Sequence, residues 1–461
     1  MLDDITMKFT RILTLLLLIH STCFGFSAYS NKELDDLEVQ FKKEINQSPQ
    51  VLRTPLADRY INKLAARLAR HGQMDKPYFF IVKSKEINAF AGPGGYIGVN
   101  TELILASQNE SELAAVMAHE MAHVRLHHLY RMIEHQKQMQ IPKLAGILAA
   151  IALGVINPTL GTGAMIGAMD SFEKDTISFI RSNEKEADSI GMDILTKADF
   201  DPEGMPSFFK KMQMNARYYY SANIPAILRT HPLDEDRIAE ADNRIAQLKG
   251  RHSSASSQQY HLFKELVRHQ VPHNTQQLFE YYNKQCLKNS PSYACQYGLA
   301  LNYQENNHDE KTIQILEPMA QGAFINDPFI NLALAQSYEV KGKKSEAKDI
   351  YQKFYGITPN NTAVLDQYSE FLESDNPRKN LSMLLKAHRK FKNDLNICYK
   401  LARAQAQLHM TAQAYFTEAT CHALQGEKKA ALTQLNVAKK YTKPNSYMAQ
   451  RIDAKIAEIK D

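Results

Sequence analysis

Most of the chain carries the apolar pattern of helices. From residue 31 to residue 71, apolar residues recur every three or four positions, which places them on one face of a helix. Residues 112–123 contain neither Gly nor Pro and are rich in strong helix formers, so they predict another helix. Beyond residue 260 the pattern is helical almost to the end of the chain. The pattern therefore predicts a fold that is mainly α.

Two short segments break this helical pattern. Residues 78–82 and 96–99 combine β-branched and aromatic residues, as strands do. Residues 88–95 lie between them and are rich in Gly and Pro, which predicts a turn. We therefore expect a small sheet that ends in a hairpin, with a helix that starts at Thr101.

The segment after residue 260 contains an approximate repeat, with a spacing near 34 residues. Its recurring positions are the aromatic residues Tyr303, Tyr338 and Tyr368 and the turn residues Asn307, Gly342 and Asn376. This pattern resembles degenerate tetratricopeptide (TPR) repeats, in which helix pairs stack into a solenoid that binds peptides or protein partners. The typical aromatic and Gly positions are only partly kept, so a non-repeating helical bundle stays open as the alternative.

Composition marks the boundaries between these parts. Residues 249–259 are basic and rich in Ser and Gln, as linkers are, which predicts an α+β domain over residues 29–250 and an α-solenoid over residues 260–461. Residues 144–169 are apolar and Gly-rich, but Pro158 and two Gly cut them below the length of a membrane span. This segment predicts a mobile flap or a contact with a membrane surface, and a buried helical hairpin is the alternative.

The first residues have the order of a secretory signal peptide. Lys8 and Arg11 precede the apolar residues 12–19, and small and polar residues follow. We predict a signal peptide at residues 1–28 and an exported protein, with an uncleaved membrane anchor as the alternative. The formal net charge of +5 is small for 461 residues, so nothing in the charge argues for nucleic-acid binding.

Cysteine usage is compatible with export. Apart from Cys23 in the predicted signal peptide, the chain contains Cys286, Cys295, Cys398 and Cys421. In an exported protein an even number permits disulfides, and Cys286 and Cys295 are the closest pair in sequence. Buried free thiols are equally compatible with the sequence. Because all four cysteines lie in the C-terminal half, a metal site in the N-terminal half must use N and O ligands.

The predicted helix at residues 112–123 carries an HExxH motif. His119 and His123 are four positions apart and project from one helix face, which is the geometry for two imidazoles to hold one Zn²⁺. Glu120 lies about 100° round the helix, where it can address a water molecule at that ion. The motif makes a zinc hydrolase the working hypothesis.

A third ligand must come from another part of the chain. His127 lies about 12 Å from His119 along the helix axis, too far to share one tetrahedral ion, so we interpret His127 and His128 as solvated or as supporting a ligand. On a second predicted helix, Glu184 could face the metal while Asp188, one turn further on, accepts the N–H of a ligating His. A charged, solvated helix face is the alternative for this pair.

HExxH followed by a helix with the pattern ExxAD resembles the zinc metallopeptidases of the CAAX-prenyl-protease and HtpX family. The segments at residues 88–90 (NAF), 94–97 (GGYI) and 230–233 (THPL), with Arg237, support the resemblance, whereas Gly92 replaces a usual Leu. The resemblance covers nearly the whole chain. Together with the export signal and the TPR-like tail, it points to the exported, repeat-bearing members of Gram-negative envelopes.

The resemblance implies a role for each site residue. It implies a zincin-like α+β metallopeptidase domain in which His119, His123 and Glu184 hold one Zn²⁺ per chain. Glu120 is implied to be the general base, which takes a proton from water and returns one to the leaving amine. Asp188 is implied to orient a ligating histidine.

His231 stays open between two roles within this resemblance. It could stabilise the oxyanion as a catalytic residue, or it could occupy the open zinc position and hold the enzyme latent. A purely structural loop, with Arg237 in a salt bridge, is a third interpretation. The strand at residues 96–99, or its hairpin partner, is expected to offer an exposed edge to which a substrate adds as a β-strand.

The function expected from these features is that of a zinc endopeptidase of the bacterial periplasm. Its substrates would be misassembled outer-membrane proteins, and its TPR-like domain would bind them or the outer-membrane assembly machinery. The alternative is a chaperone-like assembly or scaffold factor whose metal site is mostly latent.

Overall fold

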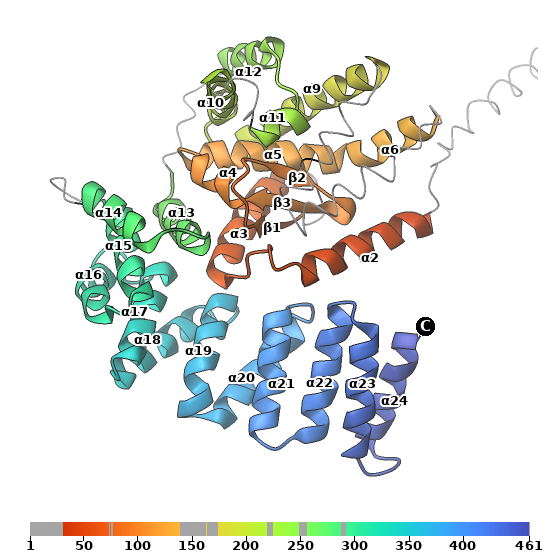
Figure 1. Ribbon diagram of the computed structural model, residues 1–461, viewed down its shortest axis with the longest axis vertical. Coiled ribbons are helices and arrows are strands. Elements are labelled where there is room, and N and C mark those ends of the chain that lie inside the picture. Colours follow the sequence, from red (N-terminus) through yellow and green to blue (C-terminus); the bar gives the residue numbers. More distant parts are fainter. Residues whose placement is uncertain are drawn as a thin grey trace, which may run out of the picture.

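The N-terminal part of the chain forms a helical domain around a small sheet, and the C-terminal part forms an arc of helices (Figure 1). This arrangement confirms the predicted fold class, mainly α with a small α+β domain followed by a helical solenoid. The computed structural model describes residues 31–72, 74, 77–138, 163, 174–218, 225–248, 256–286 and 292–460. None of the helices in these ranges combines the length and the apolar character that a membrane crossing needs.

Three predicted segments fall wholly or largely outside the described residues. These segments are the signal peptide at residues 1–28, the apolar segment at residues 144–169 apart from Gly163, and residues 249–255 of the linker. Helix α12 ends at Gln247 and helix α13 begins at Gln258, so the last two residues of the predicted linker are already helical. The predicted domain boundaries stay predictions.

Helix α5 (Glu110–Arg125) runs through the centre of the N-terminal domain, and residues 110–122 of it are all buried. Its first turn is capped by Asn109, whose side chain accepts a hydrogen bond from the Glu112 N–H at 2.9 Å. The other helices of this domain are α2 (Asn31–Gln47), α3 (Pro55–Gly72), α4 (Thr101–Ala106), α6 (His128–Gln138), α9 (Lys174–Lys197), α10 (Gly204–Tyr218), α11 (Ala226–Thr230) and α12 (Glu235–Gln247). Because α5 is buried all round, its polar side chains lie where water does not screen their charges.

The sheet contains three strands, β1 (Tyr78–Val82), β2 (Ala89–Ala91) and β3 (Tyr96–Asn100), in the order β1-β3-β2. β1 and β3 pair in parallel, with Tyr78 opposite Tyr96. The expectation that these two strands form a hairpin is therefore wrong. The hairpin partner of β3 is β2, which lies inside the predicted turn and pairs antiparallel to β3, with Ala91 opposite Ile97.

The tight connection from β2 to β3 explains this topology. Pro93–Gly95 form a single 3₁₀ turn, in which Gly94 has φ 70° and Gly95 has φ 77°. Glycine adopts this left-handed backbone at little cost, so the chain can reverse within three residues. As a result β3 occupies the centre of the sheet, and β2 is the edge strand that lies along α5.

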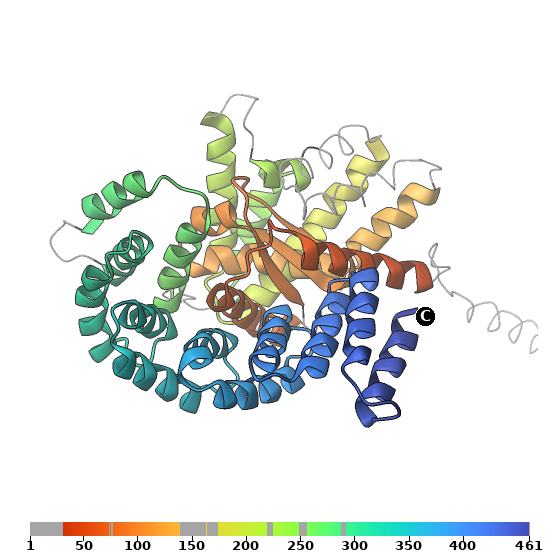
Figure 2. The same ribbon diagram turned by 60° about the horizontal axis from the view of Figure 1, so that its bottom comes forward.

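The C-terminal helices pack as antiparallel neighbours into an arc (Figure 2). Their bounds are α13 (Gln258–Gln270), α14 (Thr275–Cys286), α15 (Tyr293–Glu305), α16 (Asp309–Gln321), α17 (Pro328–Val340), α18 (Lys344–Ile357), α19 (Thr362–Asp375), α20 (Pro377–Lys390), α21 (Leu395–Gln407), α22 (Thr411–Leu424), α23 (Lys428–Lys440) and α24 (Tyr447–Lys460). The predicted turn residues Asn307 and Gly342 both have positive φ, 59° and 74°, directly after α15 and α17. The repeat of the sequence is thus a repeat of helix pairs.

Two disulfides cross-link neighbouring helices of the solenoid. Cys286 pairs with Cys295, and Cys398 pairs with Cys421, with the Cα atoms 5.8 Å apart in each pair. Of the two interpretations that the sequence left open, the structure contains the disulfides. They are the form that an oxidising compartment favours.

The solenoid encloses one side of the N-terminal domain and contacts it at both ends (Figure 2). At its start, the Phe263 ring stacks on Tyr60 with centroids 4.3 Å apart, and the Tyr260 hydroxyl donates to the Ser107 carbonyl at 2.9 Å. Near its far end, the Asn46 side chain donates to the Leu424 carbonyl at 2.9 Å. Apolar residues of both parts therefore belong to one continuous core.

A half-buried carboxyl group near this interface makes the stability depend on pH. Burial raises the pKa of Asp58 to about 7, with a smaller contribution from Asp394 of the solenoid and an opposing one from Arg53. Since the folded-state pKa exceeds that of the unfolded chain, this group's stabilising contribution is complete below about pH 4 and is lost as the pH rises through about 7. We expect Asp58→Asn to raise the melting temperature at pH 8 but not at pH 4.

Calorimetry at the two pH values checks this prediction, with Asp35→Asn as the control because Asp35 is exposed on α2. An equal change in melting temperature at both pH values would contradict it.

Candidate active site

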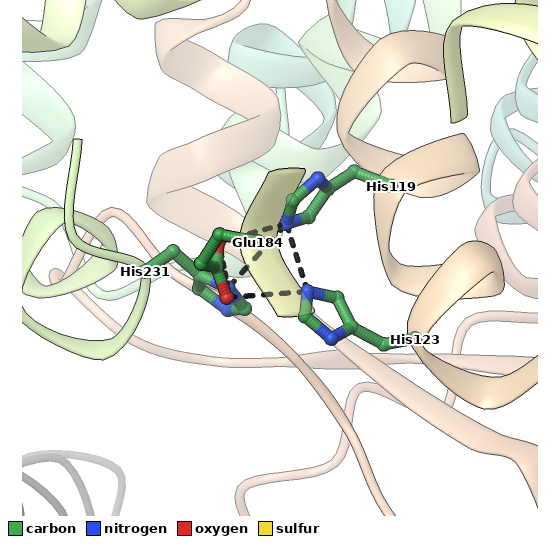
Figure 3. Close-up of side chains that lie close together, drawn as sticks. All are labelled: His119, His123, Glu184 and His231. Carbon is green, nitrogen blue, oxygen red and sulfur yellow. Dashed lines mark hydrogen bonds and ion pairs between the residues drawn. The ribbon is translucent and has the colours of Figure 1, made fainter. Parts of the chain in front are cut away.

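Two buried helices bring the predicted metal ligands together. His119 and His123 lie one turn apart on α5, and their Nε2 atoms are 3.0 Å from each other. Glu184 of α9 reaches both imidazoles, with its Oε2 3.4 Å from His119 Nε2 and its Oε1 3.4 Å from His123 Nε2 (Figure 3). Gly191 permits this approach of α9 to α5, because a Cβ at that position would lie 3.1 Å from the His119 backbone nitrogen.

Asp188 orients His119. It lies one turn after Glu184 on α9, and its Oδ1 is 3.0 Å from His119 Nδ1. The carboxylate accepts only, so Nδ1 carries the hydrogen and the Nε2 lone pair points at the cluster. Burial disfavours the charged imidazole, but Asp188 and Glu184 outweigh it and raise the pKa of His119 to about 10. The carboxylates of Asp188 and Glu184 therefore stabilise a positive charge in the buried space around His119.

A chain of three side chains orients His123. His123 Nδ1 lies 2.9 Å from His128 Nδ1, and His128 Nε2 lies 3.1 Å from the Glu186 carboxylate. Because His128 donates to Glu186, its Nδ1 accepts the hydrogen of His123 Nδ1, which leaves His123 Nε2 free to bind a cation. Burial lowers the pKa of His123 well below its usual value, and this favours the neutral imidazole that binds a metal.

Of the two histidines after the motif, only His128 belongs to the site. His128 is 3 % exposed, and the predicted supporting role describes it. His127 is exposed and lies in the turn between α5 and α6, so it is solvated. Glu186 was not predicted as a site residue from the sequence. Its position between Glu184 and Asp188 is the feature that could have indicated it.

Arg237 clamps the carboxylates from the other side. Its Nε and Nη2 donate to both oxygens of Asp188 at 2.6 and 2.8 Å, and its Nη1 lies 3.0 Å from Glu184 Oε2. The guanidinium is 3 % exposed, so this pairing is little screened by water. Burial opposes the charged form of Glu184, but its contacts with His231 and His119 outweigh it and hold the pKa of Glu184 well below its usual value. The predicted salt bridge of Arg237 is present, and it contacts the Glu184 carboxylate directly.

Glu120 is a buried carboxylate with free lone pairs. It is 1 % exposed, and neither of its oxygens has a hydrogen-bond partner among the described residues. His231 lies close by, with its Nε2 3.4 Å from Oε1. A buried carboxylate left without donors is costly in a fold, and it is the arrangement expected of a group that must accept a proton during a reaction.

His231 completes a group of four donors. It follows the short helix α11, where its backbone N–H donates to the Ile227 carbonyl at 2.8 Å. Its Nδ1 lies 3.1 and 3.3 Å from the two Glu184 oxygens and 3.4 Å from His119 Nε2 (Figure 3). The donor atoms of His119, His123, Glu184 and His231 all lie within 4.8 Å of one another. Imidazole nitrogens with a carboxylate oxygen suit a borderline divalent metal ion, so these residues fit a metal centre.

An apolar pocket adjoins this centre. It lies between α5, α10 and the segment around α11, and His119 and His231 form part of its wall. Its apolar lining includes Val116, Met205, Phe208, Met212 and Ile227. Such a pocket can accept an apolar side chain of a peptide next to the reacting bond.

Comparison with known proteins identifies the family. The model of peptidase family M48 matches residues 55–245, the part of the chain that contains the whole cluster. The β-barrel assembly-enhancing protease of Escherichia coli (strain K12) is 32 % identical over 429 residues, which are 91 % of this chain and 86 % of that protein. This chain belongs to peptidase family M48.

Two further relatives agree with this assignment. The β-barrel assembly-enhancing protease of Yersinia pestis is 30 % identical over 91 % of this chain and 87 % of its own length. The mitochondrial metalloendopeptidase OMA1 of Danio rerio is 27 % identical over 168 residues, which are 36 % of this chain and 35 % of that protein. The resemblance inferred from the sequence is confirmed, and the M48 chain is a metal-dependent endopeptidase.

Proposed function

We propose that this M48 peptidase is a zinc endopeptidase of the Gram-negative periplasm that degrades misassembled outer-membrane β-barrel proteins. The observation that carries the proposal is similarity over nine-tenths of the chain to β-barrel assembly-enhancing proteases. Two disulfides in the solenoid favour an oxidising compartment such as the periplasm.

Three residues are proposed as the protein ligands of one zinc ion. His119 and His123 supply Nε2 and Glu184 supplies a carboxylate oxygen, a two-His-one-Glu set that is known for catalytic zinc sites. Asp188 and Arg237 support them, because Asp188 fixes the tautomer of His119 and Arg237 fixes both carboxylates.

The chemistry follows from the placement of Glu120. Zinc, when bound, supplies Lewis acidity that polarises the scissile carbonyl and makes a water molecule more acidic. Glu120 has two unpaired oxygens in the same buried space, so it can take the proton of the attacking water and deliver it to the leaving amine. The adjoining apolar pocket positions the peptide by one of its side chains.

The substrate is proposed to bind as an added strand along β2. In the order β1-β3-β2, β2 has a strand neighbour on one side only, and it packs along α5, which carries the HExxH motif. Of the two edges expected from the sequence, residues 96–99 form the central strand β3, and their expected partner, residues 78–82, is β1 on the far side of the sheet from β2, so β2 was not among the expected edges. Misfolded β-barrel proteins expose strands, which is the conformation that such an edge recognises. The solenoid would deliver these substrates or bind the outer-membrane assembly machinery.

We propose that His231 holds the site latent. Its Nδ1 faces the same space as the ligand atoms, at 3.1 Å from Glu184 and 3.4 Å from His119, so it occupies the place that water needs. His231→Ala should therefore raise the rate of peptide cleavage, because it opens that position without removing a required ligand. A fluorogenic peptide assay measures the effect, and a fall in rate with unchanged metal content would instead assign the oxyanion role.

A test in cells separates degradation from the rival chaperone role. We expect wild type, but not Glu120→Gln, to clear a stalled outer-membrane β-barrel protein in a Gram-negative strain that lacks the corresponding protease. Immunoblots of the stalled protein and of its assembled form measure both activities. Equal clearance and assembly with Glu120→Gln would favour the chaperone-like scaffold and contradict the protease role.

A further inference from the structure

A second cluster of metal-binding side chains lies at the start of the solenoid, away from the catalytic residues. It consists of His269 in the last turn of α13, His273 in the turn that leads to α14, and Glu305 at the end of α15. His269 Nδ1 lies 2.9 Å from Glu305 Oε1, and His273 Nε2 lies 3.3 Å from Glu305 Oε2. The donor atoms of all three lie within 4.8 Å of one another, as in the catalytic cluster.

Backbone carbonyls fix the tautomer of both histidines. His269 Nε2 lies 3.0 Å from the Gly298 carbonyl, and His273 Nδ1 lies 2.8 Å from the Val271 carbonyl. A carbonyl oxygen only accepts, so the nitrogen that faces it carries the hydrogen. In the neutral imidazole the other nitrogen then has a lone pair, and in both rings that lone pair points at the Glu305 carboxylate.

This arrangement places lone pairs against a carboxylate at hydrogen-bond distance, which is repulsive unless a positive charge lies between them. No Lys or Arg side chain in the described ranges forms an ion pair with Glu305. The site also lies where α13 and α15 end, and the carbonyl ends of helices favour cations. The missing positive charge is either a second proton on the imidazoles or a metal ion.

The structure favours a built metal site over a chance surface contact. The His269 side chain is 1 % exposed and stacks on the Tyr282 ring, with 3° between the planes, so its orientation is fixed. Glu305 and His273 are 34 and 20 % exposed, which leaves one side of the cluster open to an incoming ion. A ligating His whose other nitrogen donates to a backbone carbonyl is the usual mode of support in metal sites.

We propose that His269, His273 and Glu305 bind a second divalent transition-metal ion of the zinc type. Two imidazole nitrogens and a carboxylate oxygen match the preference of such ions, with a water in the fourth position. The ion would join the turn after α13 to the end of α15. The neighbouring Gln270 accepts a hydrogen bond from Thr54 of the N-terminal domain at 3.0 Å, so the ion would brace the place where the solenoid meets that domain. This proposal does not rest on the proposed function.

Metal analysis of the full-length chain tests the proposal. Chelator-stripped protein is dialysed against Zn²⁺, and the bound zinc is counted by mass spectrometry. We expect two ions in the wild type, one in His273→Ala, one in Glu305→Gln and none in the combination of His273→Ala with Glu184→Ala. Circular dichroism on each variant checks folding. The substitution His273→Ala should leave the fold intact, because His273 lies in a partly exposed turn.

His422→Ala is the matched control, because His422 Nδ1 makes a similar contact with Glu427 at 2.7 Å in the same solenoid, whereas Glu418 faces the other ring nitrogen at 3.9 Å, so among the described residues these three do not form a group of donor atoms within 4.8 Å of one another. It should retain two ions. One ion in the wild type would mean that protons supply the positive charge, and this result would overturn the proposal. Two ions in His273→Ala and in Glu305→Gln would overturn it as well.

Discussion

Glu120→Gln is expected to lower kcat/KM for peptide cleavage by about 10²–10⁴-fold, the range typical for loss of a general acid or base. The amide has the size of the carboxylate but cannot take a proton. Glu120 is 1 % exposed and has no hydrogen-bond donor among the described residues, so the substitution breaks no structural contact of that kind. Metal content and melting temperature should therefore stay near those of the wild type.

A fluorogenic peptide assay in the His231→Ala background measures this loss with the largest signal, if that substitution opens the site. Glu203→Gln is the control, since Glu203 is exposed beside α10 of the same domain and should leave the rate unchanged. Activity within tenfold of the wild type in Glu120→Gln would rule out Glu120 as the general base.

The helices could be predicted because their signal is local. The apolar spacing from residue 31 to residue 71 corresponds to α2 and α3, and the predicted helix at Thr101 is α4. The sheet could be predicted only in part. β2 has three residues and lies in a segment rich in Gly and Pro, which is too short for a period of two to be visible. Without β2, a parallel pair of strands looks like a hairpin in the sequence.

The same contrast applies to the site. The pairs His119 with His123 and Glu184 with Asp188 follow from the four-residue spacing of a helix, which the sequence shows directly. Their meeting depends on the crossing of α9 over α5 at Gly191, and on the loop that places His231. Both features are tertiary contacts, which a sequence motif predicts only when it resembles a family of known fold.

The supporting residues were harder still to predict. Nothing in the spacing of His128 and Glu186 shows that they form one hydrogen-bonded chain behind His123, because the three residues lie on three different helices, α5, α6 and α9. The cluster at His269, His273 and Glu305 could not be predicted for the same reason. Its last two members are 32 residues apart in sequence, and only the stacking of helices brings them together. Only the folded chain brings such residues together.

The second large effect is expected from the proposed third ligand. Glu184→Ala removes the only carboxylate that lies within 3.4 Å of both His119 Nε2 and His123 Nε2 among the described residues. Two imidazoles alone hold a zinc ion weakly, so both the ion and the peptidase activity should be lost. Asp188 keeps its bidentate partner Arg237, and the fold should therefore survive.

The zinc content of purified Glu184→Ala beside wild type is the most direct test of the central claim. Lys185→Ala, at an exposed position next to it on α9, is the control. We predict that Glu184→Ala binds one zinc ion fewer than wild type and cleaves no peptide, whereas Lys185→Ala matches wild type in both. Undiminished zinc in Glu184→Ala would contradict the metal centre described above.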